Sequence, residues 1–281
     1  MSLEKNIAQI EAYRQQQSEQ QQKLKSRMGK IKHKVAVISG KGGVGKSTVT
    51  VNLAAAFAQK GYKVGVLDAD IHGPSVPRLL GLEGQRVKTG LPGAFPVDGP
   101  FGLKVMSIDF FLPEEAPTIW RGPLKMRAIR QFLSDIVWGE LDFLFIDLPP
   151  GTGDEPLSIA QLLPDLDGVV IVTMPSQLSS SVVRKAITFA ERLNMHIIGV
   201  VENMSGFVCP HCKEKIEIFQ SGGGKKMAEE AGVPFLGSIP IDPEIGVDSD
   251  KGHPFVVAYK DSAAAKAFME IVEKVEAYLK K

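Results

Sequence analysis

The sequence predicts an α/β protein in which helices cover both faces of a doubly wound, mostly parallel sheet. Short apolar runs that suit strands alternate with longer stretches whose apolar residues recur at helical spacing. A glycine-rich run joins the first strand of this alternation, at residues 35–38, to the helix that follows. Acidic residues follow two other apolar strands, at the sheet edge where open α/β folds place their ligands.

Length and composition are those of a globular protein with a sizeable core. The 281 residues are 44% hydrophobic and 23% charged, and the formal net charge of +1 favours neither a nucleic acid nor an acidic partner. No apolar stretch approaches the roughly 20 residues that span a bilayer, and the first residues lack the apolar core of a secretory signal. We therefore expect a cytoplasmic protein that binds no membrane.

The chain is expected to divide into an extension, residues 1–32, and a single domain, residues 33–281. The extension carries two glutamine triplets and many basic residues among scattered apolar ones. Such a segment cannot bury much surface by itself, so it is predicted to be helical or disordered. A partner-binding arm is the alternative.

The glycine-rich run has the spacing of a phosphate-binding loop. Gly40, four further residues and then Gly45, Lys46 and Ser47 fit the pattern G-x-x-x-x-G-K-[ST]. Glycines let successive backbone N–H groups face one point, and the following helix adds the positive end of its dipole. We expect Lys46 to reach the outer phosphates and Ser47 to bind Mg²⁺. The residues expected to contact ATP in this run are Gly40, Lys41, Gly42, Gly43, Val44, Gly45, Lys46, Ser47 and Thr48.

Carboxylates stand at the ends of two predicted strands. One strand leads to Asp68 and Asp70, and another ends in Asp147. Beside a phosphate loop, a carboxylate can hold Mg²⁺ through water or position an attacking water. Asp147 is the candidate on the metal side, whereas Asp68 either caps the next turn or reaches the metal shell. The run 148–154, rich in proline and glycine, is expected to be a switch that senses the terminal phosphate, with a rigid proline turn as the alternative.

The rest of the chain continues the alternation. Residues 81–103 are rich in glycine and proline and predict a long surface excursion. Trp120, Arg121 and Trp138 are expected to pack around a helix or to bond its ends. Strands are predicted at 35–38, 62–67, 103–108, 141–147, 168–173, 196–201 and 234–239, and helices at 49–58, 125–137, 178–193, 223–231 and 262–281.

The loop and its surroundings resemble a known group of dimeric ATPases. Lys41, directly after the first glycine, makes the run Lys-Gly-Gly-Val-Gly-Lys-Ser-Thr similar to the "deviant" loop of MinD, ParA and the nitrogenase iron protein. The resemblance implies that Lys41 reaches the partner subunit's nucleotide and that Asp70 positions the attacking water. It also implies that Asn203, Pro240 and Asp242 recognise adenine. For these three, turn formation is the alternative.

Cys209 and Cys212 are the only cysteines of the chain, and a C-x-x-C pair outside a secreted protein indicates metal or redox chemistry. One chain offers two thiolates where an iron–sulfur cluster or a structural zinc ion usually takes four, so a two-fold dimer would supply the rest. The number of ligands does not distinguish an iron–sulfur cluster from zinc, and a pair of free thiols remains an alternative.

A second resemblance bears on these cysteines. The run Phe207-Val208-Cys209-Pro210-His211-Cys212 occurs with Trp120-Arg121-Gly122-Pro123, the Leu-Pro-Pro-Gly-Thr-Gly-Asp switch and Gly222-Gly223-Gly224. Together they resemble the Mrp family of iron–sulfur carrier ATPases over residues 33–260. The resemblance implies a Mg²⁺-dependent ATPase whose homodimer holds a [4Fe–4S] cluster and gives it to apo iron–sulfur proteins. No second cluster site is expected.

Two other functions compete with this interpretation. A MinD- or ParA-type positioning ATPase would dimerise on a membrane or on DNA, but the C-terminal apolar stripe lacks a basic face. A zinc-bridged dimer whose assembly is regulated by ATP would use the same two cysteines.

Overall fold

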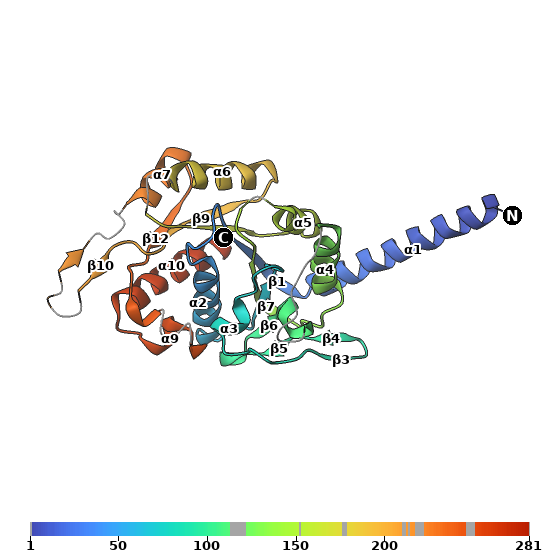
Figure 1. Cartoon of the computed structure of the whole chain (residues 1–281), viewed down its shortest axis with the longest axis horizontal. Coiled ribbons are helices and arrows are strands. Elements are labelled where there is room, and N and C mark those ends of the chain that lie inside the picture. The colour runs from blue at the N-terminus through green and yellow to red at the C-terminus, as the bar shows by residue number, and fades with distance from the viewer. Residues whose placement is uncertain are drawn as a thin grey trace.

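The computed structural model describes residues 2–112, 122–151, 153–175, 179–209, 212, 214–216, 222–245 and 251–280. Its centre is an eight-stranded sheet in the order β12-β9-β8-β1-β7-β2-β6-β5 (Figure 1). Every neighbouring pair is parallel except β5 with β6. The doubly wound α/β sheet predicted from the sequence is therefore confirmed.

The central strands are nearly all apolar because helices cover both of their faces. The strand before the phosphate loop begins at Ile31, four residues earlier than the pattern indicated, because Ile31 is buried and pairs with Leu141. The sheet strands are β1 (Ile31–Ser39), β2 (Val64–Asp68), β5 (Val97–Asp98), β6 (Lys104–Met106), β7 (Leu141–Asp147), β8 (Gly168–Thr173), β9 (Ile197–Glu202) and β12 (Phe235–Ser238).

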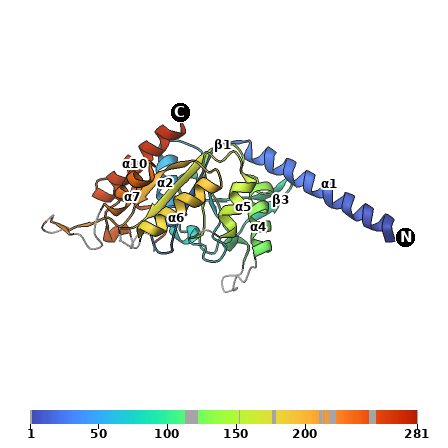
Figure 2. The same ribbon diagram turned by 90° about the horizontal axis from the view of Figure 1, so that it is seen from above.

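The long helices form two groups. The helix after the phosphate loop packs with the C-terminal helix and a short helix beside it, whereas four others pack pairwise (Figures 1 and 2). The first group is α2 (Lys46–Gln59), α9 (Phe255–Ala258) and α10 (Ala263–Leu279); the second is α4 (Gly122–Ser134) with α5 (Asp154–Leu162), and α6 (Ser179–Arg192) with α7 (Gly223–Ala231). None of the helices among the described residues is long and apolar enough to cross a bilayer.

The N-terminal segment forms helix α1 (Ser2–Met28), which projects well beyond the body of the molecule (Figure 1). At its C-terminal end Leu24 and Met28 are buried in the core, and the helix contacts α4. The glutamines lie on the turns of α1 that precede Leu24.

Several segments differ from the expected elements. Helix α5 (Asp154–Leu162) was not predicted, although Asp154, Glu155 and Pro156 directly after the proline and glycine run are typical of a helix start. The surface excursion contains the hairpin of β3 (Lys88–Gly90) and β4 (Gly93–Phe95), as well as β5.

Trp138 is buried and its indole N–H donates to the carbonyl of Phe132 at 3.0 Å, as expected for a packing role. Trp120 and Arg121 lie outside the described residues. The remaining short elements are α3 (Val76–Leu79), η1 (Pro100–Gly102), η2 (Ile108–Phe111), β10 (Phe207–Val208) and β11 (Lys215–Ile216).

Candidate functional site

The phosphate-binding loop connects β1 to α2, and glycine is required at two of its positions. Gly43 and Gly45 have φ values of 76° and 77°, which side chains with a Cβ rarely adopt. A Cβ on Gly45 would also lie 2.2 Å from Nδ2 of Asn203. Within the described part of the chain, the backbone N–H groups of residues 41–45 donate no hydrogen bond. These unpaired donors, next to the N-terminus of α2, fit a polyphosphate.

Asp147, at the end of β7, is fully buried and accepts from three side chains of α2. Lys46 Nζ lies 2.6 Å from Oδ1, the Ser47 hydroxyl donates to Oδ2 at 2.5 Å, and the Thr50 hydroxyl donates to Oδ1 at 2.7 Å. The structure thus brings together the predicted lysine, hydroxyl and carboxylate. Thr50 was not predicted, although it lies one helical turn after Lys46 on the same face.

Asp68 faces Asp147 across the β2–β7 pair, and its side chain is also fully buried. Its carboxylate accepts from the backbone N–H groups of Asp70, Ser75 and Val76, each at 3.1 Å, so it holds the turn after β2. Burial raises the pKa of the Asp68 carboxyl well above its usual range, and the negative charge of Asp147 raises it further.

Asp70 lies at the same edge of the sheet and is half-buried. Its carboxylate accepts from the backbone N–H of Gly73 at 3.2 Å. Burial raises the pKa of Asp70, while the bond from Gly73 opposes that rise.

Lys41 is half-buried, and its carbonyl accepts from the Ser39 hydroxyl at 3.0 Å. Among the residues that the structure describes, its ammonium has no carboxylate partner.

The predicted switch loop lies directly against the phosphate loop. The N–H of Leu148 donates to Val37 O at 3.1 Å and the N–H of Gly151 donates to Ser39 O at 2.8 Å. A Cβ on Gly42 would lie 3.8 Å from Cγ of Pro150. Residue Thr152 of the switch lies outside the described residues, and α5 begins two residues later.

The predicted adenine residues come from two adjacent segments behind the phosphate loop. Asn203 is buried, and its Nδ2 donates to Val44 O at 2.9 Å. The N–H of Ser205 donates to Ile239 O at 2.8 Å, which brings Pro240 close to this segment. Asp242 is half-buried, and its side chain accepts from the N–H of Glu244 at 3.1 Å in a turn.

Glu202, which the sequence did not single out, is a buried anchor beside Asn203. Its carboxylate accepts from the Ser205 hydroxyl at 2.5 Å and from the N–H of Gly222 at 3.1 Å. It also accepts from the N–H of Gly224 and, at 3.4 Å, from the Ser238 hydroxyl. Glu202 therefore holds both ends of the segment that carries the cysteines. An acid that closes an otherwise apolar strand was the one available signal.

Cys209 and Cys212 lie between the antiparallel strands β10 and β11, in a hairpin closed by the N–H of Cys209 donating to Glu214 O at 2.9 Å. Cys209 is half-buried, Cys212 is exposed, and neither forms a disulfide. The strand β10 lies at the end of the molecule opposite the tip of α1 (Figure 1). Within the described residues, no three His, Cys, Asp or Glu side chains gather into a metal site. Pro210 and His211 lie outside those residues.

A phosphate-binding loop between β1 and α2, with acids at the ends of β2 and β7, defines the P-loop NTPase class. MinD from Pyrococcus furiosus, at 23% identity, has the same fold with a TM-score of 0.61, covering 88% of this chain and 99% of that one. The chain belongs to a particular family of this class, the NUBPL iron-transfer P-loop NTPases of the ParA group, whose model matches residues 30–276.

Individual relatives agree with this family. The iron-sulfur cluster carrier protein of Methanocaldococcus jannaschii is 55% identical over 92% of this chain and 89% of its own length. The cytosolic Fe-S cluster assembly factor CFD1 of Eremothecium gossypii is 49% identical over 87% of this chain and 92% of its length. A solved nucleotide-binding protein from Archaeoglobus fulgidus, in complex with ADP and with Co found, is 46% identical with a TM-score of 0.74, covering 83% and 91% of the two chains. The resemblance noted from the motifs is confirmed.

Proposed function

We propose that this protein is a Mg²⁺-dependent ATPase that carries a [4Fe–4S] cluster between two copies of the chain and transfers it to apo iron–sulfur proteins. The observation that carries the proposal is the pair of cysteines in a hairpin apart from the nucleotide loop. An accessible site suits a carrier, because a deeply buried cluster could not be passed on. Four thiolates require two chains, and a two-fold axis brings the same hairpin of each together.

The ATPase part of the proposal uses the residues at the sheet edge. Lys46 would bind the outer phosphates, while Ser47 and Asp147 would hold Mg²⁺. The contacts of Lys46 and Ser47 with Asp147 support this part of the proposal. Asp70 would position the attacking water, and Lys41 would act on the partner subunit's nucleotide.

Asn203, Pro240 and Asp242 would surround adenine, on the segments that meet behind the loop. We propose that residues 33–281 form this domain, that 1–32 extend it, and that the protein acts in the cytoplasm, as the name of the CFD1 relative indicates for that protein.

The decisive experiment is anaerobic reconstitution with iron and sulfide, followed by metal and sulfide analysis and by sizing. We expect about four irons and four sulfides per dimer. Cys209→Ala and Cys212→Ala should each lose them while still binding ATP, because no hydrogen bond joins the described part of the hairpin to the phosphate loop. Incubation with the apo form of a [4Fe–4S] enzyme should then restore that enzyme's activity.

Three outcomes would contradict the proposal. Stoichiometric zinc without sulfide would support the zinc-bridged dimer, because zinc accepts the same four sulfurs. A cluster that remains bound to a monomer would remove the need for the two-fold site. Binding of ATP-loaded protein to lipid vesicles or DNA, with no cluster, would favour a positioning ATPase.

A further inference from the structure

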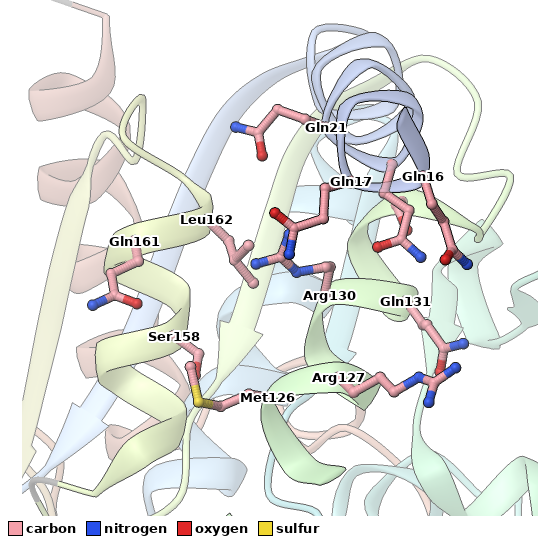
Figure 3. Close-up of a pocket in the computed structure, with 12 residues that line it drawn as sticks. Gln16, Gln17, Gln21, Met126, Arg127, Arg130, Gln131, Ser158, Gln161 and Leu162 are labelled. Atoms are coloured by element: carbon pink, nitrogen blue, oxygen red, sulfur yellow. The ribbon is translucent and has the colours of Figure 1, made fainter. Parts of the chain in front are cut away.

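Helices α1, α4 and α5 line a cavity of about 450 Å³ that is open to solvent and lies outside the nucleotide and cysteine sites (Figure 3). This volume lies within the usual range of ligand pockets, which is roughly 300–1,000 Å³. The wall from α1 is formed by Gln16, Gln17, Gln20 and Gln21, and α4 contributes Arg127 and Arg130. Figure 3 shows Gln17 and Arg130 pointing toward one another from the two helices.

The cavity exists because the facing side chains are polar. Toward its C-terminal end α1 packs against the body through Leu24 and Met28, which are buried. One to two turns earlier, the same helix presents glutamines, which cannot be buried against a neighbour without hydrogen-bond partners. Helix α1 therefore stands away from α4 and α5 there, and the space between them is lined by amides.

Among the described residues, the charge of the cavity is positive and uncompensated. No Asp or Glu of this part of the chain lines it, and neither Arg127 nor Arg130 pairs with a carboxylate there. The nearby acids bind lysines instead: Lys125 Nζ lies 2.8 Å from Glu155, and Lys23 Nζ lies 3.8 Å from Asp135. Two arginines one helical turn apart thus present planar donor groups, which bind carboxylates in bidentate fashion.

The lining amides narrow the class of ligand. A glutamine side chain offers both a donor and an acceptor, as a peptide backbone does, whereas a simple anion only accepts. Glutamines from all three helices, including Gln131 and Gln161, surround the arginines. We propose that this cavity binds an extended acidic segment of a partner protein, with its carboxylates on Arg127 and Arg130 and its backbone on the glutamines. This inference does not depend on the proposed function of the cysteines.

The test compares two libraries of short peptides, one with Asp and Glu at random positions and one with Asn and Gln at the same positions. We expect the wild-type protein to retain the acidic library about tenfold more strongly, and the double variant R127Q/R130Q to lose this preference. The matched control is K185Q/R192Q, which likewise removes two positive charges, from exposed sites on α6. Both variants should still bind ATP and iron–sulfur cluster as the wild type does.

Each contrary result overturns the inference. Equal retention of the two libraries by the wild type would show that the arginines recognise no carboxylate. An equal loss of preference in K185Q/R192Q would show that the effect comes from net charge alone. Arginine-dependent binding of inorganic phosphate or of a short oligonucleotide, in preference to the peptides, would identify an anion or nucleic-acid site instead. Replacing Gln16 and Gln20 by Ala should weaken retention several-fold, and an unchanged value would remove the role of the amides.

Discussion

Replacing Glu202 by Gln tests whether one buried carboxylate holds the cysteine hairpin in place. The wild-type carboxylate accepts from the backbone N–H groups of Gly222 and Gly224, one on each oxygen. Glutamine keeps the shape but has one acceptor oxygen and an NH₂ group. Whichever way the amide turns, one of those two backbone donors then faces another donor.

The size of the effect follows from the hydrogen bonds that the substitution removes or weakens. An unsatisfied buried donor costs about 1–3 kcal/mol, and the bonds that remain to a neutral amide are weaker than those to a carboxylate by about 1 kcal/mol in total. The free energy required to open the base of the hairpin should therefore fall by about 2–4 kcal/mol. This corresponds to a roughly 30- to 1,000-fold faster exchange of the Gly224 amide hydrogen.

Hydrogen exchange followed by NMR measures the exchange rate of the Gly224 amide directly. The amide of Val170, in the buried strand β8, should keep the wild-type rate, and ATP affinity should change less than cluster retention. The matched control is Glu244→Gln, which changes an exposed acid whose carboxylate accepts from the Tyr259 hydroxyl at 3.0 Å. Exchange of the Gly224 amide at the wild-type rate in Glu202→Gln would refute the anchoring argument.

Three further predictions concern the nucleotide site and the acid limit of stability. Lys46→Ala should weaken ATP binding roughly 10- to 150-fold, since charge-assisted bonds to phosphate contribute about 1.5–3 kcal/mol; unchanged affinity by calorimetry would exclude Lys46 from the site. Mixing Lys41→Ala with Asp70→Ala should restore part of the ATPase activity, because one composite site of each mixed dimer keeps both residues; mixed dimers without activity would place Lys41 in its own subunit's site. Glu276 accepts from Lys280, Lys60 and Tyr62, which lower its pKa from 4.5 to about 2. A lowered pKa in the folded state stabilises the protein above about pH 4.5, and this stabilisation is lost as the pH falls toward 2. After allowance for partly exposed lysines, Glu276→Gln should cost about 1–2 kcal/mol at pH 7 and little near pH 2 in unfolding experiments, whereas Glu273→Gln should cost nothing at either pH.

The alternation of buried strands and amphipathic helices was predictable because each kind of element has its own spacing of apolar residues along the sequence. The loop from Gly40 to Ser47 was equally plain, since few other functions need that spacing. The ion pair between Lys46 and Asp147 joins residues 101 positions apart, so only the sheet order could reveal it. Helix α5 was missed because the loop-like run from Pro149 to Gly153 outweighed the helix-start residues Asp154, Glu155 and Pro156 that follow it.

The least predictable residues were polar ones whose partners are distant in the sequence and meet them only in the folded protein. Glu202 gains its importance from two glycines some 20 residues later, which no local pattern connects to it. The glutamine-rich segment predicted a helical or disordered extension, with a partner-binding arm as the alternative, but nothing in it pointed to the two arginines more than 100 residues away that line the same cavity. Such sites are defined by what meets in space and not by spacing along the chain.

The contact between Lys46 and Asp147 couples two binding equilibria. A triphosphate that draws the ammonium away leaves Asp147 with hydroxyl donors alone, fully buried and beside Asp68. A buried carboxylate without its cation is costly, and a divalent ion restores the missing positive charge. In the proposed function, the affinities for nucleotide and for Mg²⁺ would therefore rise together, and by linkage each ligand would strengthen binding of the other by the same factor. The phosphate loop would thereby bind the metal–nucleotide complex in preference to either component alone.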